Sequence, residues 1–307
     1  MQNRVCLAFL LLLPPASALA ADGNRPQPPP AAVAPRVLKL RVAHLYDEKY
    51  AWHKAFERFR DLLKTRSNGA IDVQIFPNRM LGEEKHYISY MRQGALDLAT
   101  VSTGGLSTIV KEAGLFDLMY LWKDRDHWVR ALDGDVGKMM SDIIRTATST
   151  AGTPGLEVLG YWSSSELNIL GRDRGYQTMK DLQGVKMRSQ GADVQMEQWK
   201  ALGATPVVVP YDGIYDSFKT GALEAGSGIF SNIFAMKFYE VAPHISLTAH
   251  TYIVRPFIMS GHTWNKLTPA QRKLVTEAAR EATLLARELG LTKVLAAIES
   301  QKAAVKK

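Results

Sequence analysis

The sequence feature that most constrains the fold is an alternation of short strand-like runs with longer helix-like repeats. In a strand with one buried face, apolar and polar residues alternate, so apolar residues recur at every second position. On a helix they recur about every three to four residues. The first round of this pattern has strand patterns at 38–42, 71–75 and 96–101 and helix patterns at 52–63 and 82–93. Gly69 and Gly94 follow the two helix patterns. Strands and helices in this order predict an α/β fold.

The second half of the chain repeats this order with a different spacing. It has strand patterns at 185–189, 205–209, 223–230 and 246–254 and helix patterns at 191–202 and 211–220. The last two strand patterns are expected to lead back toward the first half, so that two lobes joined by crossing strands enclose a cleft. No internal repeat is detectable in the letters of the sequence. Near the end, Thr268, Pro269 and Gln271 form a capping-box pattern, which predicts a long helix that begins there and runs past Glu299.

The first 36 residues differ from the rest and are expected to precede the folded domain. A positive charge comes before an apolar run at 5–13, and Ala18 and Ala20 are small residues of the kind a signal peptidase reads. Residues 1–21 are therefore predicted to be a signal peptide, with a buried N-terminal helix as the alternative. Residues 22–36 are rich in Pro and Ala and are predicted to form a tether. The expected location is the periplasm.

Composition argues against several classes of site. Cys6 is the single cysteine and lies in the predicted signal peptide, so a disulfide framework, a Cys-ligated metal and thiol catalysis are not expected. After the N-terminal run, no apolar stretch approaches the roughly 18 residues of a membrane span, so the mature chain is not expected to be membrane-embedded. The net charge is +8, but Lys and Arg are dispersed, which favours a solvated surface over a nucleic-acid site.

A search for catalytic motifs finds none with the required spacing. The seven histidines are scattered, and no two have the helical spacing of a zinc hydrolase. The segment Gly226-Ser227-Gly228 lacks the first glycine of a nucleophile elbow, and Gly104-Gly105 lacks the lysine and the glycine spacing of nucleotide-binding loops. No catalytic residue, metal site or cofactor is therefore predicted.

Several longer motifs occur in a fixed order along the chain. They are G-A-I-D-V-Q-I-F-P at 69–77, L-G-E-E at 81–84, Q-G-A-L-D-L at 93–98, D-L-Q-G-V-K-M-R at 181–188, W-K-A-L-G-A-T-P at 199–206 and S-N-I-F-A-M-K-F-Y-E-V at 231–241. Through these motifs the chain resembles the solute-binding proteins of tripartite ATP-independent periplasmic (TRAP) transporters, of the DctP type. The resemblance covers about residues 38–300.

The resemblance implies a periplasmic binding protein fold of class α/β, with crossing hinge strands, a ligand held between two lobes and a long C-terminal helix. Lobe 1 is then expected at 37–163 plus about 253–270, lobe 2 at 164–252, and the helix that braces the lobes at 269–304. It also implies a small organic acid ligand, handed to TRAP membrane permease subunits whose energy comes from an ion gradient. The protein is expected to be a monomer and not an enzyme.

The resemblance also assigns ligand-binding residues. Arg188 matches the family arginine that receives a substrate carboxylate, and a planar guanidinium can bond both carboxylate oxygens at once. The alternative for Arg188 is a surface ion pair with Asp193 or Glu197. Asn168 stands where some members carry a second ligand-facing arginine, which makes a dianionic ligand less expected. Gly228 belongs to a segment where many members have polar side chains, and its small size leaves room for a bulkier or less polar ligand.

Further residues are expected near the ligand. Tyr211 matches a family position that is usually aromatic and lines the pocket, although packing at a helix start is the alternative. Phe230 and Asn232 belong to the matched S-N-I region, and Asn232 could equally cap the following helix. Four more residues are predicted to face the cleft from strand ends or loops: Tyr46, Ser102, Thr103 and Trp162.

The main prediction is a solute-binding protein that closes its two lobes around a small organic carboxylate held by Arg188. Two other functions remain open on the sequence. One is a ligand-presenting subunit of an extracytoplasmic sensor, which a neighbouring receptor gene would indicate. The other is a periplasmic hydrolase or lyase with an unrecognised site, which would not return its ligand unchanged.

Overall fold

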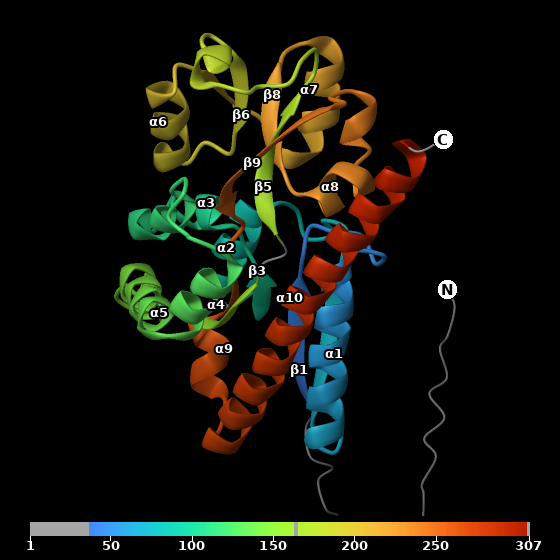
Figure 1. Ribbon diagram of the computed structural model, residues 1–307. Coiled ribbons are helices and arrows are strands. Elements are labelled where there is room, and N and C mark those ends of the chain that lie inside the picture. The colour runs from blue at the N-terminus through green and yellow to red at the C-terminus, as the bar shows by residue number, and fades with distance from the viewer. Residues whose placement is uncertain (1–36, 163–164, 306–307) are drawn as a thin grey trace, which may run out of the picture. The chain divides into compact units, whose positions relative to one another are not determined.

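Two five-stranded sheets, each in its own lobe, form the framework of the protein (Figure 1). The computed structural model describes residues 37–162 and 165–305, with side chains described throughout except at residue 51 and from residue 291 onward. The predicted signal peptide at 1–21 and tether at 22–36 lie outside the described residues.

The first sheet has the strand order β2-β1-β3-β10-β4. Its strands are β1 (Leu38–Ala43), β2 (Ile71–Phe76), β3 (Leu98–Thr100), β4 (Glu157–Trp162) and β10 (Arg255–Met259). β1 pairs in parallel with β2 and β3, whereas β10 is antiparallel to both β3 and β4. A strand from late in the sequence therefore completes a sheet that the first half of the chain begins.

The second sheet has the strand order β7-β6-β8-β5-β9. Its strands are β5 (Glu166–Gly171), β6 (Lys186–Ser189), β7 (Thr205–Val208), β8 (Ala225–Gly228) and β9 (His244–Tyr252). β6 pairs in parallel with β7 and β8, and β5 is antiparallel to β8 and β9. The two sheets thus share one pairing pattern, although the sequence shows no repeat. Three parallel strands are followed by one antiparallel strand, β10 or β5, and then by an edge strand, β4 or β9, that runs parallel to the first three.

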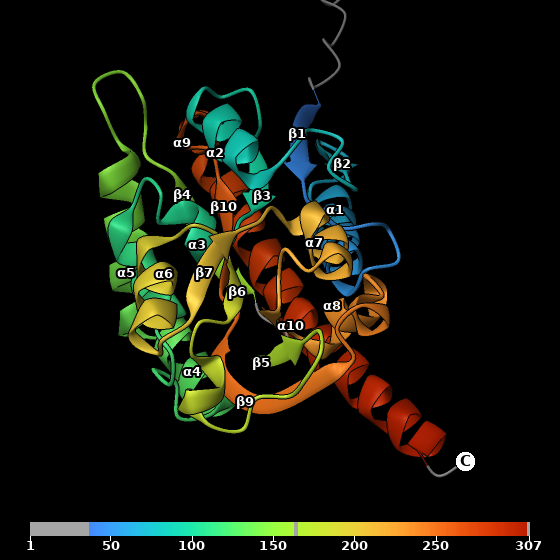
Figure 2. The same ribbon diagram turned by 90° about the horizontal axis from the view of Figure 1, so that it is seen from above.

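Helices cover the faces of both sheets. The first lobe contains α1 (Ala51–Arg66), α2 (Glu84–Arg92), α3 (Thr103–Leu106), the 3-10 helix η1 (Lys111–Asp117), α4 (Arg125–Asp133), α5 (Asp135–Thr148) and α9 (Gly261–Lys266). The second lobe contains η2 (Met179–Leu182), α6 (Asp193–Ala201), η3 (Tyr211–Gly213), α7 (Ile214–Thr220), α8 (Phe230–Ala235) and η4 (Phe238–Glu240). The long helix α10 (Pro269–Val305) packs against α1 and β4 of the first lobe and against α8 of the second (Figures 1 and 2).

Helix α1 shows how the apolar pattern becomes a core. Trp52, Phe56, Phe59 and Leu63 recur on one face of the helix and are almost completely buried. The chain leaves the helix through Gly69, whose φ of +80° is a left-handed conformation that residues with a Cβ adopt only under strain. Such a reversal lets β2 return beside β1, which builds the parallel pair.

Helix α10 begins as the capping-box pattern predicts. The Thr268 amide donates to Oε1 of Gln271 at 2.9 Å, and the Gln271 amide donates to Oγ1 of Thr268 at 3.2 Å. Farther along, the buried Arg287 donates from both terminal nitrogens to Asp133 at 2.8 Å and from Nε to the Tyr161 carbonyl at 2.9 Å. These bonds fix α10 to α4 and β4 in the first lobe.

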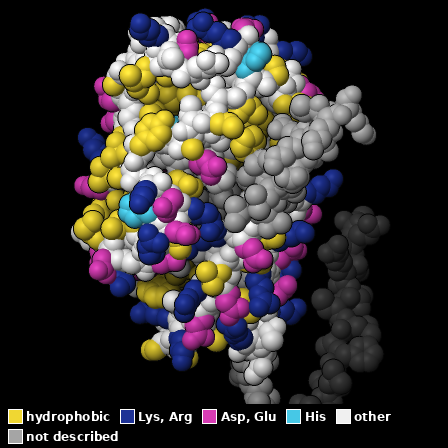
Figure 3. Space-filling model, viewed as in Figure 1, with side chains coloured by type: hydrophobic (Ala, Val, Ile, Leu, Met, Phe, Trp, Pro, Cys, Tyr) yellow, Lys and Arg dark blue, Asp and Glu magenta, His cyan; other side chains and the backbone are white. Residues whose placement is uncertain are grey.

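The charged surface is mixed in sign. On the face in Figure 3, Lys and Arg side chains alternate with Asp and Glu over the first lobe and do not gather into a patch of one sign. Arg58 and Arg66, for example, both contact Glu281. This arrangement agrees with the dispersed basic residues of the sequence.

Candidate ligand-binding site

A cavity of about 400 Å³ lies between the two sheets and is lined by both lobes. Many of its walls come from the carboxyl ends of parallel strands, where ligands of open α/β sheets bind. Tyr46 follows β1 and Ser102 follows β3 in the first lobe, while Arg188 in β6 and Tyr211 after β7 come from the second lobe. Gly228, Asn232 and Thr103 also line the cavity.

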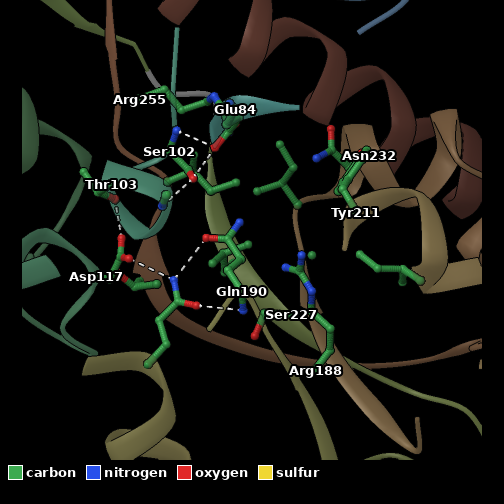
Figure 4. A pocket seen from close by; sticks show the side chains of 18 of the residues that line it. Glu84, Ser102, Thr103, Asp117, Arg188, Gln190, Tyr211, Ser227, Asn232 and Arg255 are labelled. Carbon is green, nitrogen blue, oxygen red and sulfur yellow. Dashed lines mark hydrogen bonds and ion pairs between the residues drawn. The ribbon is translucent and has the colours of Figure 1, made fainter. Parts of the chain in front are cut away.

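Arg188 extends into this cavity from β6 (Figure 4). Its Nε donates to the Val209 carbonyl at 3.1 Å, which fixes the direction of the half-buried side chain. Burial lowers the pKa of Arg188 to about 10, so the guanidinium remains charged at neutral pH. Among the described residues no carboxylate pairs with Arg188, and Glu197 instead pairs with Lys200 at 2.8 Å. The two terminal nitrogens can therefore receive an anion.

Neutral hydrogen-bonding groups lie on the same side of the cavity as Arg188 (Figure 4). Asn232 is inside α8 and does not cap it, and its Oδ1 accepts a 2.5 Å bond from the Tyr50 hydroxyl. The Asn232 amide group then keeps its NH₂ for another acceptor. Burial raises the pKa of both Tyr46 and Tyr211, so their phenols stay protonated and can donate.

A second arginine, which the sequence analysis did not select, also lines the cavity. Arg255 begins β10, is buried, and pairs with Oε1 of Glu84. Its guanidinium lies 5.6 Å from the ring centre of Tyr46 and 5.5 Å from that of Trp52. Oε2 of Glu84 accepts the amide of Ser102 at 3.0 Å and its hydroxyl at 2.6 Å. Arg255 and Glu84 therefore compensate each other's charge.

Asp117 brings a carboxylate to the opposite side of the cavity from Arg188 (Figure 4). It accepts the Thr103 hydroxyl within the first lobe and Nε2 of Gln195, from α6 of the second lobe, at 2.8 Å. Gln195 also donates to Oε1 of Gln190 at 3.3 Å. Burial raises the pKa of Asp117 to about 6, and the two hydrogen bonds limit that rise.

Two of the predicted residues pack in apolar cores and do not line the cavity. Trp162 is completely buried, with its ring 4.6 Å from Phe56 and its Nε1 bonded to Thr283 at 3.0 Å. Phe230 is 7% exposed and belongs to the core of the second lobe with Phe218. Trp162 ends β4 and Phe230 begins α8, both near the cavity, but their side chains pack into the hydrophobic cores of the two lobes.

Asn168 does not line the cavity either, and the structure gives it a different role. Its Oδ1 accepts the Ala249 amide at 3.0 Å. The β5–β9 pairing shifts register beside Asn168, and Ala249 has a φ of +44°. The Asn168 side chain thus satisfies a backbone donor at a β-bulge, a place where the regular ladder cannot do so.

Two of the lining residues that sequence reasoning missed, Arg255 and Asp117, carry a recognisable signal. Arg255 follows Ile253 and Val254 and precedes Pro256 and Phe257, and Asp117 stands between Phe116 and Leu118. A charged residue inside an apolar run must either break the run or be buried with partners. Glu84 belongs to the L-G-E-E motif at 81–84, which did not mark it as a ligand-binding residue. For Gln190, Gln195 and Ser227 no comparable signal exists, because polar residues in loops and on helix surfaces are common.

Two negative findings apply to the described part of the chain. Within residues 37–162 and 165–305, no three His, Cys, Asp or Glu residues are grouped closely enough to hold a metal ion. No helix in that part of the chain combines the length and apolar content that crossing a membrane requires.

Two sheet-bearing lobes around a cavity with an uncompensated arginine define the class of two-lobed solute-binding proteins. The chain belongs to the DctP family, described as bacterial extracellular solute-binding protein, family 7, whose model matches residues 42–305. It is a solute-binding component of the TRAP type and not an enzyme, a conclusion that rests on family membership and not on the missing catalytic motifs.

Relatives and solved structures agree with this assignment. A solute-binding protein of Sulfitobacter sp. (strain NAS-14.1) is 32% identical over 251 residues, which are 81% of this chain and 74% of the relative. A TRAP solute-binding protein of Pseudomonas putida F1, solved with bound D-glucuronate, matches with a TM-score of 0.80 and 28% identity over 87% of this chain and 85% of that one. One from Sulfurospirillum deleyianum DSM 6946, solved with bound succinate, gives 0.78 and 27% over 87% and 85%.

Proposed function

We propose that this chain captures a small organic monocarboxylate in the periplasm and hands it to the membrane permease subunits of a TRAP transporter. The ligand's carboxylate binds Arg188, and Tyr211, Asn232 and Tyr46 supply neutral donors around it. The D-glucuronate and succinate held by the two structures above support a carboxylate as the ligand class.

The observation that carries the proposal is a charged guanidinium without a carboxylate partner among the described residues. Its Nε is fixed to Val209 and its remaining nitrogens reach the cavity. A buried cation costs free energy unless an anion compensates it. A carboxylate in the cavity would provide that compensation through two parallel hydrogen bonds.

The lobes are proposed to close on the ligand, because only the closed form brings both walls into contact with it. The working division is lobe 1 at 37–163 plus about 253–270, lobe 2 at 164–252, and a bracing helix at 269–304. Export by a signal peptide at 1–21, a tether at 22–36 and a monomeric state belong to the same proposal. The strands of the two sheets are compatible with this division.

Calorimetric titration of ligand-free protein with organic acids tests the proposal. Arg188→Ala should weaken binding of the best ligand by about 2–5 kcal/mol, because the ligand charge would be enclosed without its partner. Arg188→Lys should recover only part of that loss, because an ammonium lacks the bidentate geometry.

Arg172→Ala is the matched control. It removes a guanidinium from the same lobe, but Arg172 is 37% exposed in its side chain and contacts Asp173. Its affinity should equal that of the parent protein. Full affinity in both Arg188 variants would show that another group holds the carboxylate.

A further inference from the structure

The charges that line the cavity do not cancel completely. Arg255 is compensated by Glu84, and Glu83 lies 3.7 Å from Arg79. Lys85 is exposed, so solvent and salt screen its charge. What remains, among the described residues, is one cation without a carboxylate, Arg188, and one carboxylate without a cation, Asp117.

Asp117 retains capacity to bind a ligand. An ionised carboxylate has about four acceptor positions, and the Thr103 hydroxyl and the Gln195 amide use two of them. At neutral pH the carboxyl is mostly ionised, because its raised pKa of about 6 still lies below 7. The other positions can accept only from donors, since a carboxylate has no proton to give.

The position of Asp117 is fixed by both lobes. Gln198 in α6 donates from Nε2 to the Asp117 carbonyl at 3.2 Å and accepts the Met119 amide at 2.6 Å. A Cβ at Gly104 would lie 2.4 Å from Oε1 of Gln190 and 3.2 Å from Oδ2 of Asp117. The carboxylate therefore cannot easily move away from a ligand group that it repels.

We infer that Asp117 is a specificity-determining residue, which selects ligands with hydroxyl or ammonium donors at the end remote from their carboxylate and rejects ligands with a second carboxylate there. This inference rests on the proposed function, because it takes Arg188 as the site of the first carboxylate. It separates two ligand types that similar proteins hold, D-glucuronate and succinate.

The physical reason is the low dielectric of a closed cavity. Two carboxylates brought together without water repel strongly, whereas a hydroxyl or ammonium forms a charge-assisted bond with the same oxygen atoms. Arg255 does not relieve this repulsion, because Glu84 already compensates it. A dicarboxylate therefore pays for burial of its second charge without gaining a cation.

Three acids that differ only at carbon 6 test the inference: D-galactonate, 6-amino-6-deoxy-D-galactonate and galactarate. They end in a hydroxyl, an ammonium and a carboxylate respectively. At about pH 7.5, ligand-free protein should bind the better of the first two at least about tenfold more tightly than galactarate. Which of those two binds better identifies the donor that Asp117 prefers.

Asp117→Asn removes the charge with little change of shape. It should reduce the ratio between the affinity for the better donor-ended acid and the affinity for galactarate to within about threefold. Asp216→Asn is the control, since it makes the same charge change in the second lobe at an exposed residue of α7 that does not line the cavity. The control should keep the ratio of the parent protein.

The parent ratio tests the inference even where Asp117→Asn does not fold. Galactarate binding as tightly as the other acids would overturn the inference and leave the role of Arg188 intact. An unchanged ratio in folded Asp117→Asn would overturn it as well. Binding of none of the three acids, nor of D-glucuronate or succinate, would overturn the proposed ligand class and this inference with it.

Discussion

Acidification should destabilise this protein through two buried histidines. Burial lowers the pKa of His44 from 6.5 to about 3, with help from the nearby His53 and Arg255, and burial lowers that of His250 to about 4. His44 lies 3.0 Å from His53 between ring nitrogens, and His250 bonds the hydroxyl of Ser227 at 3.0 Å.

The direction of the stability change with pH follows from which state takes up protons first. Below about pH 6.5, the pKa of a free imidazole, the unfolded chain protonates both histidines, whereas the folded protein keeps them neutral until the pH approaches about 3 or 4. The stability that neutral burial provides is complete above pH 6.5 and is lost as the pH falls. When the pH is lowered from about 7.5 to 5, each histidine should lower the free energy of unfolding by about 2 kcal/mol.

Asp117 acts in the opposite direction. Its raised pKa of about 6 means that the folded state takes up a proton before the unfolded chain does, which returns about 1 kcal/mol of stability over the same interval. The expected net loss is about 3 kcal/mol. Urea unfolding of ligand-free protein at the two pH values measures it.

The variant His250→Gln isolates one of the two histidines. Its stability at pH 7.5 is expected to be lower, because it loses hydrogen bonds, but its further loss on acidification should shrink by about 2 kcal/mol. The exposed His244, changed to Gln, is the control and should leave the pH dependence unaltered. A pH dependence in His250→Gln equal to that of the parent would refute the reasoning.

Three further predictions concern single contacts. Arg287→Met should lower the free energy of unfolding by about 2 kcal/mol in urea, because Asp133 and the Tyr161 carbonyl lose their donor; an unchanged value would contradict the anchoring of α10. Gly104→Val should weaken ligand binding about tenfold or more by calorimetry, since its side chain obstructs lobe closure; parent-like affinity would contradict this. Asn168→Ala should cost about 1–2 kcal/mol of stability and change ligand affinity by less than about threefold, and a larger affinity loss would place Asn168 at the ligand.

Local patterns predicted the elements with strong periodicity. The strands expected at 38–42, 71–75, 185–189 and 205–209 are confirmed with small changes at their ends, and so is the long C-terminal helix. Its single weak point, Gly290, does not interrupt it, because packing along the helix offsets the low helix propensity of one glycine. The strands expected at 96–101 and 223–230 are shorter in the structure.

The sheet order could not be predicted from the same patterns. The insertion of β10 between β3 and β4 joins residues about 160 apart in sequence on the β3 side and about 100 apart on the β4 side, and no local property of Arg255–Met259 encodes these partners. The pairing pattern that the two sheets share could not be predicted for the same reason, because two sheets can have the same topology without similar amino-acid sequences.

The candidate site divides in a similar way. Arg188 was selected through a motif, and its approach to the cavity depends on one bond to Val209 that only the fold creates. Asp117 and Gln195 meet across the two lobes from positions 78 residues apart, so no spacing rule finds them. Trp162 and Phe230 show the converse limit, because proximity to a strand end does not fix the direction of a side chain.

The placement of the cavity at strand ends separates two tasks along single strands. In β6, Met187 is buried in the core while its neighbour Arg188 reaches the cavity. Strand alternation makes adjacent residues face opposite sides, so an exchange at a cavity position leaves the packing neighbour in place. Substitutions at a few cavity-lining positions, in evolution or by design, can thus change which ligand the protein binds while the core residues that stabilise the fold stay the same.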